Sequence, residues 1–149
     1  NYYNMRGDNI TQETAIFDPF FELSECPTIG IGDGGNEIGM GNIHATLRDL
    51  NLIASTTTCD ELVVADVSNW GAYGLLVFLN LWSDSELLRE ISHANLIEYM
   101  VRNGACDGVT AKTTISEDGF SSKKGAKLIE KLCDLLGNYK NCRYSTLKK

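Results

Sequence analysis

Six glycines crowd into twelve positions of this sequence, in the stretch TIGIGDGGNEIGMGN (Thr28 to Asn42), around one aspartate and one glutamate. A glycine within a helix or strand lowers the stability of the fold by about 0.5–1 kcal/mol relative to alanine. Six of them so close together therefore indicate a structural or functional need for glycine. Thr28 to Gly32 has the pattern of a strand, and roughly Glu37 to Leu50 has the apolar spacing of a helix. Bare backbone between a strand and a helix indicates a turn that a ligand can approach closely.

The rest of the chain alternates predicted strands and helices. Leu62 to Val67 (LVVADV) is a continuous apolar run, typical of a strand buried on both faces of a parallel sheet. Up to residue 81 we also expect a helix over 19–25 with Asp18 as N-cap and a helix over 70–81. Beyond it we expect a broken helix from Ser83 or Asp84 to Asn103 ended by Gly104, a strand over 108–110, a turn or hairpin over 115–120 on Asp118-Gly119, a helix over 122–136 ended by Gly137, and a frayed basic tail.

This alternation predicts a single domain over residues 1–149 with an α/β fold: a layered sheet, largely parallel, with helices on both faces. Ligands in such folds bind beyond the carboxyl ends of the strands. Two polar clusters follow the predicted strands, over residues 33–37 and 66–69. We therefore expect both clusters at one edge of the sheet.

Charge and cysteine content narrow the class of protein. Residues 1–66 hold eleven acidic and two basic side chains, which argues against a nucleic-acid partner because phosphates require a basic face. The longest apolar run, Trp70 to Trp82, is too short to span a membrane. The odd number of dispersed cysteines suits reduced thiols and predicts an intracellular protein, in the cytoplasm or the mitochondrial matrix. The cysteines are Cys26, Cys59, Cys106, Cys133 and Cys142.

One interpretation of the glycine-rich turn is a dinucleotide fingerprint, because Gly30, Gly32 and Gly35 satisfy GxGxxG. Two features weaken it. Gly30 lies inside the predicted strand, and Asp33 would place a negative charge where a pyrophosphate must approach. The chain also lacks the GKS or GKT of a P-loop, so that phosphate-binding class is excluded.

A second interpretation makes use of the carboxylates. Asp33 and Glu37, with the side-chain carbonyl of Asn36, are hard oxygen ligands suited to Mg²⁺ or Mn²⁺. The exposed backbone N–H groups of Gly34 and Gly35 could hold a substrate carboxylate or phosphate beside the ion. A third interpretation needs no ligand: Asp33 caps the following helix and Glu37 complements its dipole. Ser68 and Asn69 can likewise line a site or cap the helix after the second strand.

The chain as a whole resembles the C-terminal domain of the D-glutamate cyclase family. Four segments in this order support the resemblance: NYYNMRGDNI, GIGDGGNEIGMGNI, VADVSNWGAYGL and VRNGACDGVT. The family's domain is about twice as long, so the resemblance implies that this chain is the second half of a larger domain. The preceding half, or a partner chain, would complete the sheet and the site.

The resemblance implies a metal-assisted lyase that converts D-glutamate, a small anionic substrate, into 5-oxo-D-proline and water. In that reaction we assign Asp33 and Glu37 as ligands of Mg²⁺ or Mn²⁺, with Asp33 counted among the catalytic residues. Asp66 is the general base or a residue supporting it. The groups expected to bind the substrate are Gly34, Gly35, Asn36, Ser68 and Asn69.

Two rival functions remain open at the level of sequence. Another metal-dependent hydrolase, such as a phosphatase, would use the same pairing of a divalent ion with anion-binding backbone. A non-catalytic module that binds a small anion or a nucleotide is the alternative from a different class. The two histidines, His44 and His93, have no Ser or Cys in motif spacing, so a serine or cysteine hydrolase is not indicated.

Overall fold

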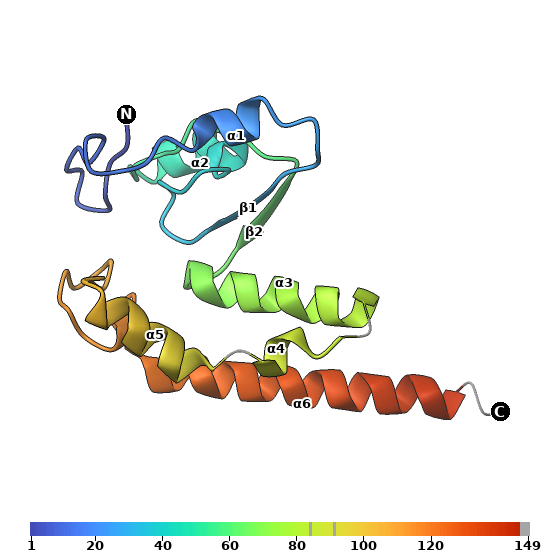
Figure 1. Ribbon diagram of the computed structural model, residues 1–149. Coiled ribbons are helices and arrows are strands. Elements are labelled where there is room, and N and C mark those ends of the chain that lie inside the picture. Colours follow the sequence, from blue (N-terminus) through green and yellow to red (C-terminus); the bar gives the residue numbers. More distant parts are fainter. Residues whose placement is uncertain (84, 91, 147–149) are drawn as a thin grey trace. The chain divides into compact units, whose positions relative to one another are not determined.

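The structure is a computed structural model that describes residues 1–83, 85–90 and 92–146, with side chains as far as residue 139 (Figure 1). The chain divides into two compact units, Asn1–Gly71 and Ala72–Lys149, which are described separately. The single domain over 1–149 stays a prediction. The elements are α1 (Asp18–Glu22), β1 (Ile29–Gly32), η1 (Gly41–Ile43), α2 (His44–Asp49), β2 (Glu61–Val64), α3 (Ser68–Ser83), α4 (Leu87–Glu90), α5 (His93–Arg102), β3 (Ser116–Glu117), β4 (Phe120–Ser121) and α6 (Ser122–Thr146).

The first unit is built on a parallel pair of strands. β1 and β2 run side by side with Gly30 opposite Leu62 and Gly32 opposite Val64 (Figure 1). This confirms a chain of mixed helix and strand that contains a small parallel sheet. Within the described residues that sheet has two strands. The larger layered sheet with helices on both faces therefore stays a prediction.

Backbone lies close against both faces of this strand pair. A Cβ built on Gly71, in the first turn of α3, would lie 2.8 Å from Cγ2 of Ile31 and 3.4 Å from Cγ1 of Val63. On the other face, a Cβ on Gly30 would lie 3.0 Å from Cα of Gly39. The glycines of the turn thus allow backbone to pack directly on the sheet.

The helix predicted from Glu37 to Leu50 begins later than expected. Gly39 has φ +100°, and the N–H groups of Gly39 and Gly41 both donate to the carbonyl of Thr57 at 3.0 Å. These bonds to a distant segment hold residues 38–40 out of the helix. Regular helix starts only with η1 and α2, whose Leu47 is buried in the core of the unit.

Most other boundaries follow the sequence pattern. β2 begins at Glu61, one residue before the predicted strand, and ends at Val64 instead of Val67. Phe17 rather than Asp18 is the N-cap of α1, which ends at Glu22 instead of residue 25. The broken helix is confirmed as α4 and α5, followed by Gly104 at φ +91°. α6 does not end at Gly137 but continues to Thr146. The predicted frayed tail is thus helical up to that residue, and positions 147–149 lie outside the described residues.

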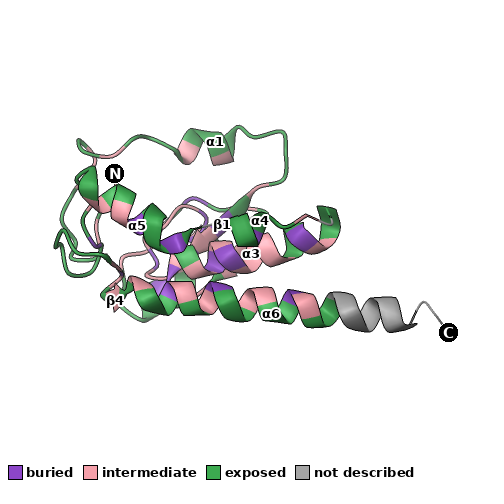
Figure 2. Ribbon diagram, turned by 60° about the horizontal axis from the view of Figure 1, so that its bottom comes forward, coloured by how far each residue is buried: buried purple, intermediate pink, exposed green. Residues whose placement is uncertain are grey.

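The second unit packs helices on one long helix. α4 and α5 both contact α6, on which buried positions alternate with exposed ones (Figure 2). The predicted hairpin is confirmed: β3 and β4 pair antiparallel across Asp118 and Gly119, whose φ angles of +48° and +79° give the twist that a two-residue hairpin turn needs. The buried apolar side chains of this unit are Tyr73, Leu88, Ile97, Ile129 and Leu136.

The prediction of a strand over 108–110 is wrong, because the side chain of Asp107 binds the backbone N–H groups of this segment. Oδ1 of Asp107 accepts hydrogen bonds from the N–H groups of Val109 at 3.1 Å and Thr110 at 2.7 Å. Oδ2 accepts from the Ser116 hydroxyl at 2.7 Å and from the Gly119 N–H at 2.8 Å. One buried carboxylate therefore organises the loop and its hairpin, and the backbone groups it holds are not available to a sheet.

We expect Asp107→Asn to destabilise the chain by about 1.5–3 kcal/mol at pH 7, because an amide cannot accept bonds on its NH₂ side. Burial raises the pKa of Asp107, but the hydrogen bonds from Ser116, Thr110 and Gly119 outweigh it and lower the pKa well below the ordinary value. A lowered pKa gives stability that is present above about pH 4 and is lost as the pH falls further.

Urea unfolding at pH 7 and pH 3 measures this effect on the parent and on Asp107→Asn. The difference between the two proteins should shrink at pH 3. Asp134→Asn, which changes an exposed carboxylate of α6, serves as the control and should match the parent at both pH values. A penalty for Asp107→Asn that is equal at both pH values would rule out the carboxylate's charge as its source.

In the part of the chain described here, no helix has the length and apolar character needed to cross a membrane. The cysteines with described side chains are free thiols: Cys26, Cys59, Cys106 and Cys133.

Candidate functional site

The carboxylate of Asp33 joins the ends of the two parallel strands. Asp33 directly follows β1, and its Oδ2 accepts hydrogen bonds from the backbone N–H of Ser68 at 2.8 Å and from the Ser68 hydroxyl at 2.6 Å. Ser68 begins α3, four residues after β2 ends. The structure thus brings together two of the predicted site residues at the carboxyl edge of the sheet, where the negative charge also favours the N-terminus of α3.

The carboxylate of Glu37 folds back onto the glycine turn. Its Oε1 accepts from the N–H of Gly34 at 3.2 Å and its Oε2 from the N–H of Gly35 at 2.8 Å. Adjacent backbone N–H groups of this kind form an anion-binding concavity. The turn therefore holds a carboxylate, as its glycines suggested, but that carboxylate belongs to the protein, and a substrate anion would have to replace it.

The remaining predicted residues lie around this turn. The Asn36 side chain donates to the carbonyl of Tyr3 at 2.9 Å and so ties the N-terminal segment to the turn. Asp66 lies in the bend between β2 and α3 with its side chain exposed, and Asn69 is also exposed in the first turn of α3. Both side chains are accessible to a ligand.

The sequence predicted a divalent-metal site at Asp33 and Glu37. Across the residues that the structure describes, no three His, Cys, Asp or Glu side chains group closely enough to hold a metal ion. The two carboxylates expected to bind the ion, those of Asp33 and Glu37, both accept hydrogen bonds from nearby backbone N–H groups. Asp33 and Glu37 thus offer hard oxygen donors, and the divalent-metal site stays a prediction.

A pocket of about 300 Å³ opens beside the turn, with Asn36 in its wall. The N-terminal segment, the start of α1 and residues 53–57 form the rest of the wall. Among its polar groups are Tyr2, Asp18 and Thr57, none of which the sequence pattern singled out. Asp18 had been assigned to helix capping next to Pro19, and no local signal places Tyr2 or Thr57 beside it.

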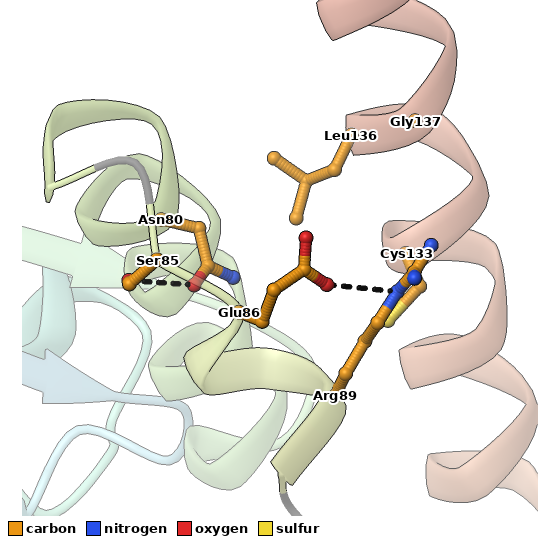
Figure 3. Close-up of a pocket in the computed structure, with 7 residues that line it drawn as sticks. All are labelled: Asn80, Ser85, Glu86, Arg89, Cys133, Leu136 and Gly137. Atoms are coloured by element: carbon orange, nitrogen blue, oxygen red, sulfur yellow. Dashed lines mark hydrogen bonds and ion pairs between the residues drawn. The ribbon is translucent and has the colours of Figure 1, made fainter.

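The second unit offers a much smaller cavity, of about 30 Å³, between the end of α3, α4 and α6 (Figure 3). Its wall includes the buried Asn80, whose Oδ1 accepts from the Ser85 hydroxyl at 3.3 Å, and the ion pair of Arg89 with Glu86 at 3.2 Å. That volume holds about one water molecule. Of these two, only the pocket beside the glycine turn has the volume typical of a ligand pocket.

The first unit thus combines a small parallel sheet, a glycine turn whose N–H groups bind the Glu37 carboxylate, and a pocket beside that turn. Residues 1–133 match the family described as D-glutamate cyclase-like, C-terminal, and the chain belongs to that family. The human protein named D-glutamate cyclase, mitochondrial, is 42% identical over 83 residues, which cover 50% of this chain and 14% of that protein. The family expected from the sequence is confirmed, and this chain matches only a small part of the curated relative's length.

Proposed function

We propose that this chain takes part in the cyclisation of D-glutamate to 5-oxo-D-proline and water, as the C-terminal part of a larger D-glutamate cyclase-like domain. The observation that carries the proposal is the family match over residues 1–133, which includes every predicted site residue. The name of the human relative supports the same reaction and a lyase activity. The glycine turn contributes a backbone that already holds a carboxylate.

The reaction is an intramolecular condensation. The nitrogen of D-glutamate attacks the carbon of its own side-chain carboxylate, an N–C bond forms, and a C–O bond breaks. The two protons that the ammonium group loses leave with the departing oxygen as water. Holding the substrate folded supplies several kcal/mol of the barrier, because the reacting groups are then already oriented.

We assign the roles by position in the site. The N–H groups of Gly34 and Gly35 would take a substrate carboxylate in place of Glu37, which swings away as the substrate enters. Asp66 is exposed beside the strand ends and would accept a proton from the ammonium group. Asn36 and Asn69 would donate hydrogen bonds to the substrate.

The proposal includes Mg²⁺ or Mn²⁺ as a cofactor of the complete site. Asp33 and Glu37 would contribute carboxylates, with Ser68 holding Asp33 in place, and the further ligands would come from the substrate and from the rest of the protein. A divalent ion supplies Lewis-acid polarisation of a carboxylate, a poor electrophile on its own.

The sheet supports the view that the domain continues beyond this chain. Parallel sheets are normally buried on both faces and have more than two strands. Here Ile29 of β1 is 51% exposed and Val64 of β2 is 56% exposed. We propose that strands from the rest of the protein extend this pair into a layered, largely parallel sheet with helices on both faces. The human relative is named as mitochondrial, and we propose that this protein lies inside the cell, in the cytoplasm or the mitochondrial matrix.

Three measurements separate the candidate functions. The longest natural protein that contains this chain is incubated with D-glutamate, with a generic phosphate ester, and with each in the presence of Mn²⁺. Loss of D-glutamate to a pyrrolidone product supports the proposal. Release of phosphate would instead indicate a hydrolase, and calorimetric binding of D-glutamate without turnover would indicate a non-catalytic module.

A further inference from the structure

The 300 Å³ pocket beside the glycine turn has an acidic group built into its wall. The carboxylate of Asp18 accepts a hydrogen bond from the Tyr2 phenol on Oδ2 and one from the Thr57 hydroxyl on Oδ1, at 2.7 Å. Thr57 is only 9% exposed. The Tyr2 oxygen in turn accepts from the N–H of Phe17 at 3.0 Å. This network fixes the carboxylate's orientation.

The network also keeps Asp18 ionised. The hydrogen bond from Tyr2 lowers the pKa of Asp18, burial opposes it, and the hydrogen bond from Thr57 lowers the pKa again, so the net result lies below the ordinary value. At neutral pH the Asp18 side chain therefore carries a full negative charge. Its two side-chain donors are neutral hydroxyl groups, which orient the charge without compensating it.

No basic side chain within the described residues lies within ion-pair distance of Asp18. The ion pairs found there join other residues: Arg6 with Asp8, Arg89 with Glu86, His93 with Glu117, and Arg102 with Glu98. The surrounding half of the chain adds to the negative potential, since residues 1–66 hold eleven acidic and only two basic side chains. The ammonium group of Asn1, which also lines the pocket, lowers the pKa of Asp18 further but is not within ion-pair distance of it. A partly buried carboxylate with no cation at ion-pair distance is stabilised by a cationic ligand.

We propose that this pocket binds the ammonium group of an amino-acid ligand, with Asp18 as the acceptor and Asn36 linking the pocket to the glycine turn. The inference rests on the proposed function. It adds the site that would bind the ammonium group, which distinguishes D-glutamate from a plain dicarboxylate. The volume, about 300 Å³, lies at the small end of the range for ligand pockets and suits a single amino acid.

Binding of two ligands to the full chain tests the inference. D-glutamate and glutarate share both carboxylates and differ in the ammonium group, so the parent chain should bind D-glutamate more tightly. Asp18→Asn should remove this preference by weakening D-glutamate about tenfold or more while changing glutarate little. The matched control is Asp60→Asn, because Asp60 also accepts from a backbone N–H and a hydroxyl, both of Thr28, but lies outside the pocket.

A second variant tests the pocket independently of Asp18, in case Asp18→Asn fails to fold. Ala54→Leu adds bulk to the pocket wall without touching a carboxylate and should weaken both ligands, with thermal unfolding confirming that the chain stays folded. Equal binding of D-glutamate by the parent, Asp18→Asn and Ala54→Leu would overturn the inference. Failure of D-glutamate to bind the chain at all would also overturn it. Neither outcome overturns the proposed function, which is judged separately by turnover in the longer protein.

Discussion

Gly39→Ala should destabilise the first unit by roughly 2–5 kcal/mol, a large share of the 5–15 kcal/mol that holds a typical domain together. Gly39 has φ +100°, which side chains disfavour. An added Cβ would lie 2.9 Å from Cα of Gly30 and 3.0 Å from Sγ of Cys59. Relief would require the turn to move off β1, and the N–H of Gly39 would then lose the Thr57 carbonyl.

Gly34→Ala is the matched control within the same glycine-rich stretch. Gly34 has no positive φ, and its Cβ would approach other atoms no closer than 3.4 Å, an ordinary contact. We expect its stability to stay within about 1 kcal/mol of the parent. Urea unfolding gives the energies, and hydrogen exchange of peptides covering β1 and β2 locates the damage. Equal stability of the two variants would show that the close packing of Gly39 on Gly30 contributes little.

Gly125→Ala should have a comparable effect on the second unit, about 2–5 kcal/mol. Gly125 lies in α6 against a buried pair, in which Nε2 of His93 and Oε1 of Glu117 are 2.8 Å apart. His93 is 4% exposed and Glu117 is 5% exposed. A Cβ on Gly125 would lie 2.7 Å from Cε1 of His93 and closer still to the two paired atoms. The methyl group would therefore force the pair apart inside the core.

The same helix supplies the control for this substitution. A Cβ on Gly137 meets nothing within 4 Å, so Gly137→Ala removes a helix-destabilising glycine at no steric cost and should stabilise the chain by about 0.5–1 kcal/mol. Thermal unfolding followed by circular dichroism compares both variants with the parent. If Gly125→Ala also raised the melting temperature, the tight packing of α6 on the His93 and Glu117 pair would be contradicted.

Local pattern was sufficient for several features. The apolar run at Leu62 predicted β2, Asp118-Gly119 predicted the hairpin, and Gly104 predicted the end of α5, because each depends on residues close in sequence. The pairing of Asp33 with Ser68 follows from the same logic. Parallel strands place their carboxyl ends at one edge of the sheet, so polar residues after each strand can meet there.

The errors arose where distant atoms decide the local structure. The carbonyl of Thr57 holds the turn out of the predicted helix, and the side chain of Asp107 turns a predicted strand into a loop. Neither partner is visible in a window of hydrophobic periodicity. The pocket beside the turn also depends on contacts between distant residues. Tyr2, Asp18 and Thr57 are far apart in sequence and meet only in the folded chain. The roles proposed for Asp33, Glu37 and Asp66 in the reaction stay predictions.

Proton NMR of D-glutamate incubated with the longest natural protein that contains this chain tests the proposed reaction most directly. Resonances of 5-oxo-D-proline should appear with the parent protein, and Asp33→Asn should abolish their accumulation, while Asp49→Asn, an exposed carboxylate of α2, should leave the rate unchanged. D-glutamate that stays intact with the folded parent protein, or a product that forms at the parent rate with Asp33→Asn, would contradict a cyclase site at the end of β1.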